Sequence, residues 1–441
     1  MSGIAQLLLA CGYKVSGSDL KENRITQELK KSGAQIFPAH ASGNINGADI
    51  VVYSSAIGEN NPEVLEAKRQ GVPLVMRAQA LATLMQDKTV ITVAGSHGKT
   101  TTTSLVSYLL LEAGLSPTVA IGGILKNIDT NACLGNGKFF VAEADESDGS
   151  FLNYKPEYSI VTNIDREHLD YYKTFEREIE AFKRFIDRTS SGGCVFYSAD
   201  DPNLINIMKG YKNKCISFGL KEGARIHPEN IKFEGLSSEF DCIFNNKFVD
   251  RFNLALGGEH NISNALSVIA LGLELGIGLG LIKEALSGYK GSRRRLEIKS
   301  ANNGYIVIDD YAHHPTEIRA TLKAAKRLKH KKLIAIFQPH RYTRTQLLLG
   351  DFAGSFSGVD YLVITDIYAA SEQPIAGVDA GSLCEKIKES GENKEVRCIA
   401  KDKIVEHILE VIKPGDLVVT LGAGDIAKVS DELAERIEGK R

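Results

Sequence analysis

Short apolar runs separated by stretches of helical periodicity repeat along the whole chain. In the middle third, four of these runs read as strands, at residues 89–94, 139–144, 158–163 and 195–198. Nearly continuous apolar runs of this length are typical of parallel strands that helices cover on both faces. A long helix is expected at residues 261–275. The pattern therefore predicts an α/β fold.

The same alternation restarts after residue 296, with strands expected at residues 305–308, 333–337, 361–365 and 417–421. Before residue 88, the apolar segments 14–18, 49–53 and 73–75 are separated by polar helical runs such as residues 62–70. This first part opens inside a helix, at residues 3–10. An α/β nucleotide domain normally opens with a strand and a glycine turn. We therefore expect the first strand of its sheet to be missing.

The length of the chain, 441 residues, suits about three domains of ordinary size. Residues 288–292 read as a connector, and the pattern predicts domains at residues 1–87, 88–291 and 292–441. No internal repeat or low-complexity tract interrupts this division.

The composition favours a cytoplasmic protein. A net charge of −2 gives no electrostatic reason for a nucleic-acid or membrane partner, and the basic cluster Arg293 to Arg295 is too short to change that. No run of 18 apolar residues predicts a membrane span. Seven cysteines without a C-x-x-C pair fit a reducing compartment. The apolar opening lacks the preceding positive charge of a signal peptide.

The most informative segment is G-S-H-G-K-T-T-T-T, the nucleotide loop (residues 95–103), which lies between an expected strand and an expected helix. Backbone N–H groups of such a loop and the helix N-terminus attract a phosphate, and Lys99 adds a full positive charge. Thr100 can offer its hydroxyl to Mg²⁺. The loop is shorter than the common phosphate-loop pattern, which would need a glycine at Val93. An ordinary capped helix start is the alternative interpretation.

Acidic side chains follow two of the expected strands. Four carboxylates lie within residues 143–148, and residues 162–170 add Asp, Glu and His at the end of the next strand. In parallel sheets the carboxyl ends of strands form the ligand crevice, and Mg²⁺ prefers oxygen ligands. A solvated acidic turn is the alternative. Because a hard cation prefers oxygen, His168 reads as a general base, a capping donor or a surface histidine before it reads as a ligand.

Two histidine clusters follow strands of the last third, at residues 309–317 and 338–345. Corresponding positions in one domain indicate a single crevice. Arg341 and Arg344 suit bidentate capture of a carboxylate or phosphate, although an exposed basic helix start is the simpler interpretation. Arg293 to Arg295 can be a solvated hinge or a source of positive charge for the nucleotide site. Cys/His metal spacing and a G-x-S-x-G elbow are absent from the sequence.

Nine motifs in order give the chain a resemblance to the Mur ligases of peptidoglycan synthesis. They are GSHGKTTTT, EADESDGSF, TNIDREHLD, GGEHNISNAL, GSRRRLE, DDYAHHPTE, FQPHRYTRT, DIYAASEQPIAGV and GAGDI. The resemblance implies a three-domain α/β architecture with a Rossmann-like UDP-binding domain, a central P-loop ATPase-like domain and a C-terminal Rossmann-like domain. Its first domain would lack the first strand.

The resemblance also implies an activity. ATP, with Mg²⁺, would phosphorylate the lactyl carboxylate of UDP-N-acetylmuramate, and the amine of L-alanine would attack the acyl phosphate to give amide, ADP and phosphate. Cations would neutralise the transferring phosphoryl group, and the fold would position the reactants. The protein would be a monomer or a dimer.

The family pattern assigns residues to ATP and metal. It implies that Lys99 binds the β- and γ-phosphates, that Thr100 and Glu143 bind one Mg²⁺ and that His168 binds a second. The full set expected at ATP is Gly95, Ser96, His97, Gly98, Lys99, Thr100, Thr101, Asn261 and Asn264 near the adenine, Arg294 at the phosphates, Asp309 at the ribose and Tyr311 as a stacking partner.

The family pattern assigns a second set to the sugar nucleotide and the amino acid. In the first part these are Ser2, Gly3, Ser18, Asp19, Ser54, Ser55 and Arg77, with Gly122 and Gly123 near the sugar. In the last third they are His313, His340, Arg341, Tyr342 and Arg344. The catalytic residues implied are Lys99, Glu143, His168, His313 and Arg344.

One departure and three alternatives qualify the resemblance. The family begins with a strand and a G-x-G-G-x-G-M-S-G loop, whereas this chain enters at Met1-Ser2-Gly3. Met1 is then either an internal methionine of a longer product, which we favour, or the start of a truncated protein with impaired UDP binding. The alternative activities are a ligase of recycled tripeptide, a folate polyglutamylating enzyme, which would lack DDYAHHPTE, and a sugar-nucleotide sensor, which would lack Lys99, Glu143 or His168.

Overall fold

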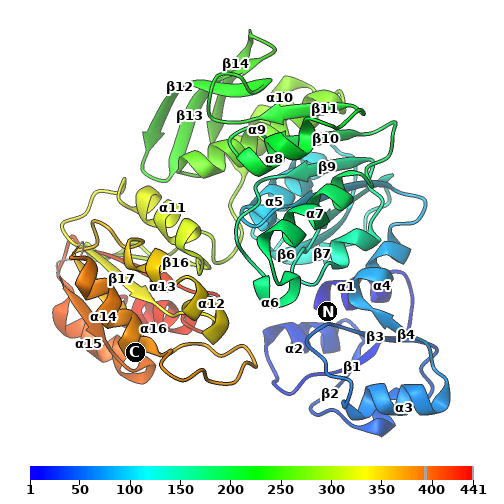
Figure 1. Cartoon of the computed structure of the whole chain (residues 1–441), viewed down its shortest axis with the longest axis horizontal. Coiled ribbons are helices and arrows are strands. Elements are labelled where there is room, and N and C mark those ends of the chain that lie inside the picture. The colour runs from blue at the N-terminus through cyan, green and yellow to red at the C-terminus, as the bar shows by residue number, and fades with distance from the viewer. Residues whose placement is uncertain (392–394, 440–441) are drawn as a thin grey trace. The chain divides into compact units, whose positions relative to one another are not determined.

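The computed structural model describes residues 1–391 and 395–439. The chain divides into two compact units. The first unit holds residues 1–229, 241–252 and 263–290, and the second holds residues 230–240, 253–262 and 291–441 (Figure 1). In the part of the chain that the structure describes, no helix has the length and apolar character needed to cross a bilayer.

The centre of the first unit is β5 (Thr89–Ala94), which pairs in parallel with β8 (Phe139–Glu143) on one side and β9 (Tyr158–Val161) on the other. They belong to a ten-stranded sheet with the order β14-β13-β12-β11-β10-β9-β5-β8-β6-β7. The other strands are β6 (Thr118–Leu125), β7 (Thr130–Cys133), β10 (Cys194–Ser198), β11 (Cys215–Phe218), β12 (Ile226–Glu234), β13 (Ser237–Phe244) and β14 (Lys247–Leu254).

Long helices accompany this sheet, and the nucleotide loop joins β5 to the first of them, α5 (Lys99–Glu112). The others are α6 (Leu169–Tyr172), α7 (Phe175–Ile186), α8 (Pro202–Met208), α9 (Glu259–Glu274) and α10 (Leu279–Gly288), with a 3₁₀ turn, η2, at Ser150–Asn153. The strands expected at residues 89–94, 139–144, 158–163 and 195–198 are all present, within two residues at each end. The helix expected at residues 261–275 is α9.

The first part of the chain has four short strands in two separate parallel pairs. β1 (Ser16–Ser18) pairs with β2 (Gln35–Phe37), and β3 (Val51–Tyr53) pairs with β4 (Leu74–Met76). All four are exposed or half-buried, unlike β5. The helices here are α1 (Ser2–Ala10), α2 (Arg24–Lys31), α3 (Pro62–Gln70) and α4 (Arg77–Leu84), with a 3₁₀ turn, η1, at Ser42–Ile45.

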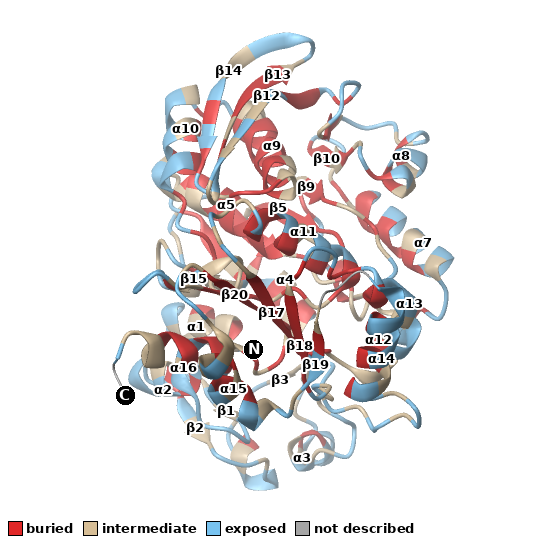
Figure 2. Cartoon of the chain, turned by 90° about the vertical axis from the view of Figure 1, so that its left-hand side faces the viewer, coloured by how far each residue is buried: buried red, intermediate tan, exposed pale blue. Residues whose placement is uncertain are grey.

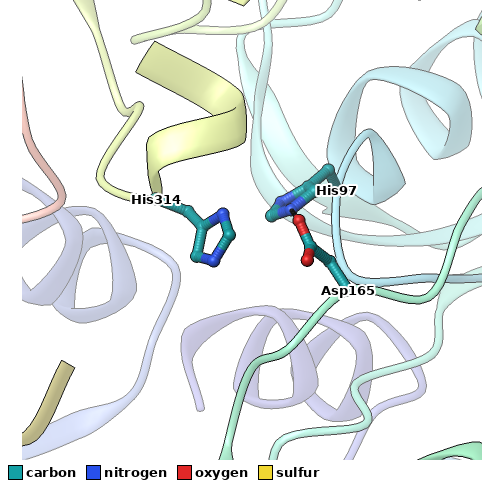
Figure 3. A group of neighbouring side chains, drawn as sticks. All are labelled: His97, Asp165 and His314. Carbon is teal, nitrogen blue, oxygen red and sulfur yellow. Dashed lines mark hydrogen bonds and ion pairs between the residues drawn. The ribbon is translucent and has the colours of Figure 1, made fainter. Parts of the chain in front are cut away.

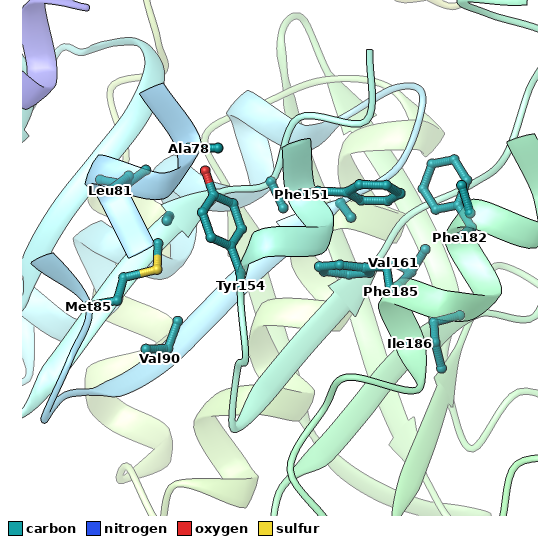
Figure 4. Close-up of a cluster of buried hydrophobic side chains, with 14 of the residues drawn as sticks. Ala78, Leu81, Met85, Val90, Phe151, Tyr154, Val161, Phe182, Phe185 and Ile186 are labelled. Carbon is teal, nitrogen blue, oxygen red and sulfur yellow. The ribbon is translucent and has the colours of Figure 1, made fainter. Parts of the chain in front are cut away.

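A hydrophobic cluster joins this first part to the central sheet (Figure 4). Ala78, Leu81 and Met85 from α4 and its C-terminal end are buried in the same cluster as Phe151 and Phe185. The rings of Phe151 and Phe185 stack at 4.9 Å with an interplanar angle of 10°. Burying each phenylalanine contributes roughly 1.5–3 kcal/mol. The segment that precedes the nucleotide loop is therefore fixed to the sheet by apolar packing.

The second unit contains a six-stranded sheet with the order β15-β16-β20-β17-β18-β19. Its last strand in the chain, β20 (Leu417–Leu421), lies between β16 (Ile306–Asp310) and β17 (Leu333–Phe337) and is parallel to both. Figure 2 shows β17 and β18 as buried and the outer faces of the helices around them as exposed. The other strands are β15 (Glu297–Ser300), β18 (Tyr361–Ile364) and β19 (Val396–Cys398).

Separate hydrophobic clusters cover the two faces of this sheet, as continuous apolar strands require. The helices that supply them are α11 (Pro315–Ala325), α13 (Leu349–Ala353), α14 (Ala380–Ser390), α15 (Ile404–Val411) and α16 (Ala427–Ile437). The unit also contains α12 (Tyr342–Leu347) and a 3₁₀ turn, η3, at Lys401–Lys403. The strands expected at residues 305–308, 333–337, 361–365 and 417–421 are present as β16, β17, β18 and β20.

Candidate active site

The nucleotide loop turns sharply at two glycines. Gly95 has φ 133° and Gly98 has φ 83°, conformations that glycine adopts readily and other residues avoid. A Cβ atom on Gly95 would lie 2.1 Å from Thr162 Oγ1, and one on Gly98 would lie 2.8 Å from Asn264 Oδ1. The loop therefore needs glycine at both positions, for conformation and for space. Thr101 follows in the first turn of α5 and is buried.

Lys99 lies at the start of α5 with its ammonium folded back over the loop. Its Nζ donates to the carbonyl oxygens of Gly95 at 2.6 Å and Ser96 at 3.1 Å, and to Glu146 Oε1 at 2.7 Å. Burial opposes the positive charge, but the carboxylates of Glu146 and Asp145 outweigh it and raise the pKa of Lys99. These carboxylates therefore favour the protonated form of the ammonium at the loop.

Glu143, the last residue of β8, connects the loop to β6. Thr100 Oγ1 donates to Glu143 Oε1 at 3.1 Å, and the backbone N–H of Gly122 donates to Glu143 Oε2 at 2.8 Å. A Cβ atom on Gly122 would lie 2.7 Å from the same carboxylate, and one on Gly123 would lie 3.0 Å from Thr100 Cγ2. A hydroxyl and a carboxylate side by side are suitable oxygen ligands for Mg²⁺.

A second group of possible metal ligands consists of Glu146, Glu167 and His168, whose ligand atoms all lie within 4.8 Å of one another. His168 Nε2 is 3.5 Å from Glu146 Oε1 and 3.6 Å from Glu167 Oε2. Burial opposes protonation of His168, but these carboxylates raise its pKa. Glu146 is fully buried, and its Oε2 accepts no hydrogen bond from the described residues. Glu146 Oε2 is therefore a suitable ligand atom for a cation.

Glu146 was not expected to take part in the site. Of the acidic segment 143–148 only Glu143 was predicted to be functional, yet the carboxylate against Lys99 and His168 belongs to Glu146. The signal was present, because all four carboxylates of the segment follow β8. Sequence spacing alone does not show which of them turn toward the loop. Behind this group, Glu178 of α7 is also fully buried, and burial beside Glu146 and Glu167 raises its pKa to about 9.

His97 belongs to the loop and points to the end of the neighbouring strand β9. Figure 3 shows its ring beside the carboxylate of Asp165, with His97 Nε2 and Asp165 Oδ2 2.9 Å apart. The backbone N–H of His97 donates to Asn163 Oδ1 at 2.9 Å, and Thr162 Oγ1 donates to the carbonyl of His97 at 2.6 Å. The segment after β9 therefore fixes the shape of the nucleotide loop. Asp201 in turn accepts from the backbone N–H of Ile164 at 2.8 Å.

The first part of the chain contributes Arg77, the first residue of α4. Its guanidinium lies 3.0 Å from Asp145 Oδ2, next to the acidic end of β8. Lys99 and Arg77 counter the effect of burial and lower the pKa of Asp145. The structure brings this arginine, which was expected at the sugar nucleotide, to the strand end that also carries Glu143.

Ser18, at the end of β1, lies in a polar network that the sequence analysis did not foresee. Its hydroxyl is 2.8 Å from His40 Nδ1 and donates to Glu63 Oε2 at 2.9 Å, and Asn44 Nδ2 donates to Glu63 Oε1 at 2.6 Å. The remaining first-part residues lie at the first turn of α1 or directly after strands: Ser2, Gly3, Asp19, Ser54 and Ser55.

In the second unit, Arg294 is bound to residues of the sheet. Its guanidinium donates to Asp309 Oδ2 at 3.0 Å and to the carbonyl oxygens of Gly422 and Gly424. Burial raises the pKa of Asp309, and Arg294 opposes that shift. The guanidinium carbons of Arg294 and Arg295 each lie 5.1 Å from the ring centre of Tyr311. An aromatic ring between cations is suited to stacking on a base.

The two histidine clusters meet at one edge of this sheet. The rings of His313 and His340 are 5.7 Å apart between centroids, and Tyr368 stacks on His340 at 5.5 Å with an interplanar angle of 10°. Arg344 NH1 donates to His340 Nδ1 at 3.1 Å. This geometry brings the two clusters together, and the single crevice stays a prediction. Tyr368, in the loop after β18, was not foreseen as part of it.

Glu372 organises the start of α12, where arginines were expected. It accepts from the backbone N–H and the hydroxyl of Thr343, at 3.1 and 2.6 Å, and lies 3.9 Å from Arg341 NH1. Tyr342 is the first residue of α12. Asn261 and Asn264 lie three positions apart on α9, both buried, and Asn261 Nδ2 donates to the carbonyl of Gly257 at 2.8 Å.

Three family models match consecutive segments of the chain. The Mur ligase family catalytic domain matches residues 1–89, the Mur ligase middle domain matches residues 93–272, and the Mur ligase glutamate ligase domain matches residues 294–424.

Curated relatives match along almost the full length. A UDP-N-acetylmuramate–L-alanine ligase of Desulfatibacillum aliphaticivorans is 46% identical over 438 residues, covering 99% of this chain and 96% of that protein. One from Aquifex aeolicus is 44% identical over 440 residues, covering 99% and 95%.

Solved structures agree. The crystal structure of a UDP-N-acetylmuramate-alanine ligase from Thermotoga maritima has a TM-score of 0.86 and 30% identity, covering 100% of this chain and 97% of that one. A murein peptide ligase from Psychrobacter arcticus has a TM-score of 0.73 and 25% identity, covering 99% and 96%.

Proposed function

The chain belongs to the Mur ligase family, and we propose that it is an ATP-dependent ligase that joins L-alanine to the lactyl carboxylate of UDP-N-acetylmuramate in the synthesis of peptidoglycan precursors. The observation that carries the proposal is similarity to L-alanine ligases over the whole length, together with a nucleotide loop whose Lys99 and Thr100 donate hydrogen bonds to Glu146 and Glu143.

The nucleotide loop and the acidic side chains next to it would bind ATP. Lys99 would bind the β- and γ-phosphates, and the loop's backbone N–H groups would contact the anion. Phosphoryl transfer is accelerated mainly by positioning and by cations that neutralise the moving charge. A lysine whose charge is secured by buried carboxylates meets that requirement.

Magnesium fits the donor atoms of two places in this site. Thr100 and Glu143 would hold one ion, and His168, with Glu146 and Glu167, would hold a second. The fully buried Glu146 oxygen that accepts no hydrogen bond from the described residues supports the second place. When bound, Mg²⁺ would neutralise phosphate charge.

The two organic substrates would bind outside the loop. Ser2, Gly3, Ser18, Asp19, Ser54, Ser55 and Arg77 are proposed for the UDP moiety, and Gly122 and Gly123 for the sugar. His313, His340, Arg341, Tyr342 and Arg344 are proposed for the amino acid and the acyl phosphate. Arginine suits such a site because its planar fork binds a carboxylate or phosphate in bidentate fashion. Because ATP and the sugar nucleotide are the substrates, we propose the cytoplasm as its location.

The test is phosphate release with Mg·ATP and UDP-N-acetylmuramate, measured separately with L-alanine, glycine, L-serine and the recycled tripeptide as acceptors. We expect release to depend on both the sugar nucleotide and an acceptor, with L-alanine the best. Preference for the tripeptide would reassign the chain to the murein peptide ligases. Binding of both nucleotides without release for any acceptor would identify a sensor.

A further inference from the structure

Hydrogen bonds connect three polar side chains at the end of the first strand pair. Ser18 is the last residue of β1, in register with Phe37 at the end of β2, and His40 follows three residues later. The Ser18 hydroxyl is 2.8 Å from His40 Nδ1 and donates to Glu63 Oε2 at 2.9 Å. Ligands of α/β sheets bind at the carboxyl ends of the strands, so these side chains lie at a ligand-binding position.

Glu63 takes part in this network as an acceptor. Its other oxygen, Oε1, accepts from Asn44 Nδ2 at 2.6 Å and from the backbone N–H of Ala41 at 3.4 Å. Glu63 lies in the first turn of α3, where the partial positive charge of the helix N-terminus favours a carboxylate. A carboxylate has no proton to donate, so the single proton of the Ser18 hydroxyl is given to Glu63.

The direction of that bond fixes the tautomer of His40. Because the proton of Ser18 goes to Glu63, the Ser18 oxygen accepts from His40, and Nδ1 carries the imidazole proton. The other nitrogen of a neutral imidazole, Nε2, is then an acceptor. Within residues 1–391 and 395–439, Nε2 has no hydrogen-bond partner. The side chain of His40 keeps 23% of its surface exposed, so a ligand can reach this acceptor.

The nucleoside end of a sugar nucleotide is the ligand expected beside this acceptor. Asp19 directly follows Ser18, and its backbone N–H donates to the carbonyl of Phe37 at 3.1 Å. In dinucleotide-binding α/β folds an acidic residue in this part of the sheet binds the ribose. Asp19 comes after α1 and β1, which puts the ribose beside it and the base near the loops that follow β1 and β2. His40 belongs to the second of these loops.

We propose that His40 selects uracil, with its Nε2 accepting the N3–H of the base of UDP-N-acetylmuramate. This inference rests on the proposed ligase function and adds a determinant of substrate choice. Uracil carries a proton on N3, whereas N3 of cytosine is an acceptor, and two acceptors that face each other repel. Ser18 and Glu63 are positioning residues, because they fix the His40 proton on Nδ1 and away from Nε2.

Calorimetric titration of the full chain with UDP, CDP and N3-methyl-UDP tests this assignment. The titrations are run at about pH 8.5, where imidazole side chains are neutral. N3-methyl-UDP has a methyl group in place of the proton in question. The variants to compare are His40→Gln and the matched control His40→Asn. The amide of glutamine reaches the place of Nε2, and its oxygen can accept, whereas the amide of asparagine reaches only the place of Nδ1.

The wild-type protein should bind UDP at least about tenfold more tightly than CDP or N3-methyl-UDP. His40→Asn should bind UDP about 3–10-fold more weakly and lose the preference, while its affinity for N3-methyl-UDP does not fall. His40→Gln should keep part of the preference. Equal losses for all three nucleotides in His40→Asn would overturn the proposal, and so would a wild-type protein that binds UDP without preference. Failure of the wild-type protein to bind any of them would instead overturn the proposed function, and the inference with it.

Glu63→Gln tests the fixed tautomer at nearly unchanged side-chain size. Glutamine can donate as well as accept, so the Ser18 proton is no longer committed to residue 63 and can be donated to His40 Nδ1. Nε2 of His40 can then carry the proton and donate to N3 of cytosine. The affinity gap between UDP and CDP should therefore narrow in Glu63→Gln. An unchanged gap would contradict the positioning role of Glu63.

Discussion

Replacing Lys99 with methionine removes the cation that neutralises a fully buried carboxylate. Glu146 has no exposed surface, and its Oε1 accepts from Lys99 Nζ at 2.7 Å. Methionine keeps much of the apolar stem but leaves the carboxylate charge without its main partner. Breaking a buried ion pair from one side costs about 3–5 kcal/mol, because the remaining charge stays desolvated. His168 Nε2, 3.5 Å from the same oxygen, places the expected loss at the lower end.

The assay is calorimetric unfolding of the protein without nucleotide, so that stability is separated from activity. For a cooperative unit of about 150–250 residues, each kcal/mol lowers the melting temperature by about 2–4 °C, so a loss of about 3 kcal/mol should make Lys99→Met melt about 6–12 °C below wild type. The double variant Lys99→Met/Glu146→Gln removes both charges and should recover part of that loss. Both variants should lack phosphate release, because the loop cation is gone.

The pH dependence of protein stability tests the same ion pair between Lys99 and Glu146. An unpartnered buried glutamate has a raised folded-state pKa, so its penalty is present above the unfolded pKa and fades as acid protonates it. The gap between Lys99→Met and wild type should therefore shrink from pH 8 to pH 5, and the double variant should show no such trend. Additive effects of Lys99→Met and Glu146→Gln, with the same gap at both pH values, would refute the view that Glu146 is the counter-ion of Lys99.

Three further outcomes follow from the first unit. Burial raises the pKa of Glu178 from 4.5 to about 9, so the folded state keeps a proton that the unfolded chain releases. The free energy of unfolding should therefore fall by about 1.4 kcal/mol per pH unit between about pH 5 and 9. In urea unfolding, Glu178→Gln should flatten this slope, and an unchanged slope would contradict the assignment. Gly98→Ala should abolish binding of an ATP analogue in calorimetric titration, because the new Cβ would lie 2.8 Å from Asn264 Oδ1. The control Gly114→Ala should bind the analogue normally, because Gly114 also has a positive φ but no atom lies within 4 Å of its added Cβ. Asp201→Ala should destabilise by about 1–3 kcal/mol and slow phosphate release, because it leaves a buried backbone N–H after β9 without its acceptor; wild-type thermal stability would rule this out.

Those strands of the two main sheets that are buried on both faces could be predicted from the sequence. β17 is apolar along its whole length, and threonine is the only polar residue type in β5 and β20, a pattern that hydrophobicity alone identifies. The strands β12 and β14 were not predicted. Each is exposed or half-buried over much of its length and carries charged residues, so neither shows a continuous apolar run.

The residues of the candidate site also fall into two groups, those that the sequence could show and those that it could not. The glycine loop and Lys99 could be found because their spacing is local, within a few residues of one strand and one helix. Glu146, His40 and Tyr368 could not, because each is identified by a partner distant in sequence: Lys99, Ser18 and His340.

The strand order of the second unit has a consequence for how the protein is made. β20 occupies the middle of its sheet between β16 and β17, although it is synthesised after every other strand there. A ribosome-bound chain therefore holds two half-sheets with unsatisfied backbone edges until residues 417–421 emerge, and such edges recruit chaperones or neighbouring nascent chains. A nonsense mutation shortly before residue 417 would remove a central strand of this sheet, not only a terminal segment.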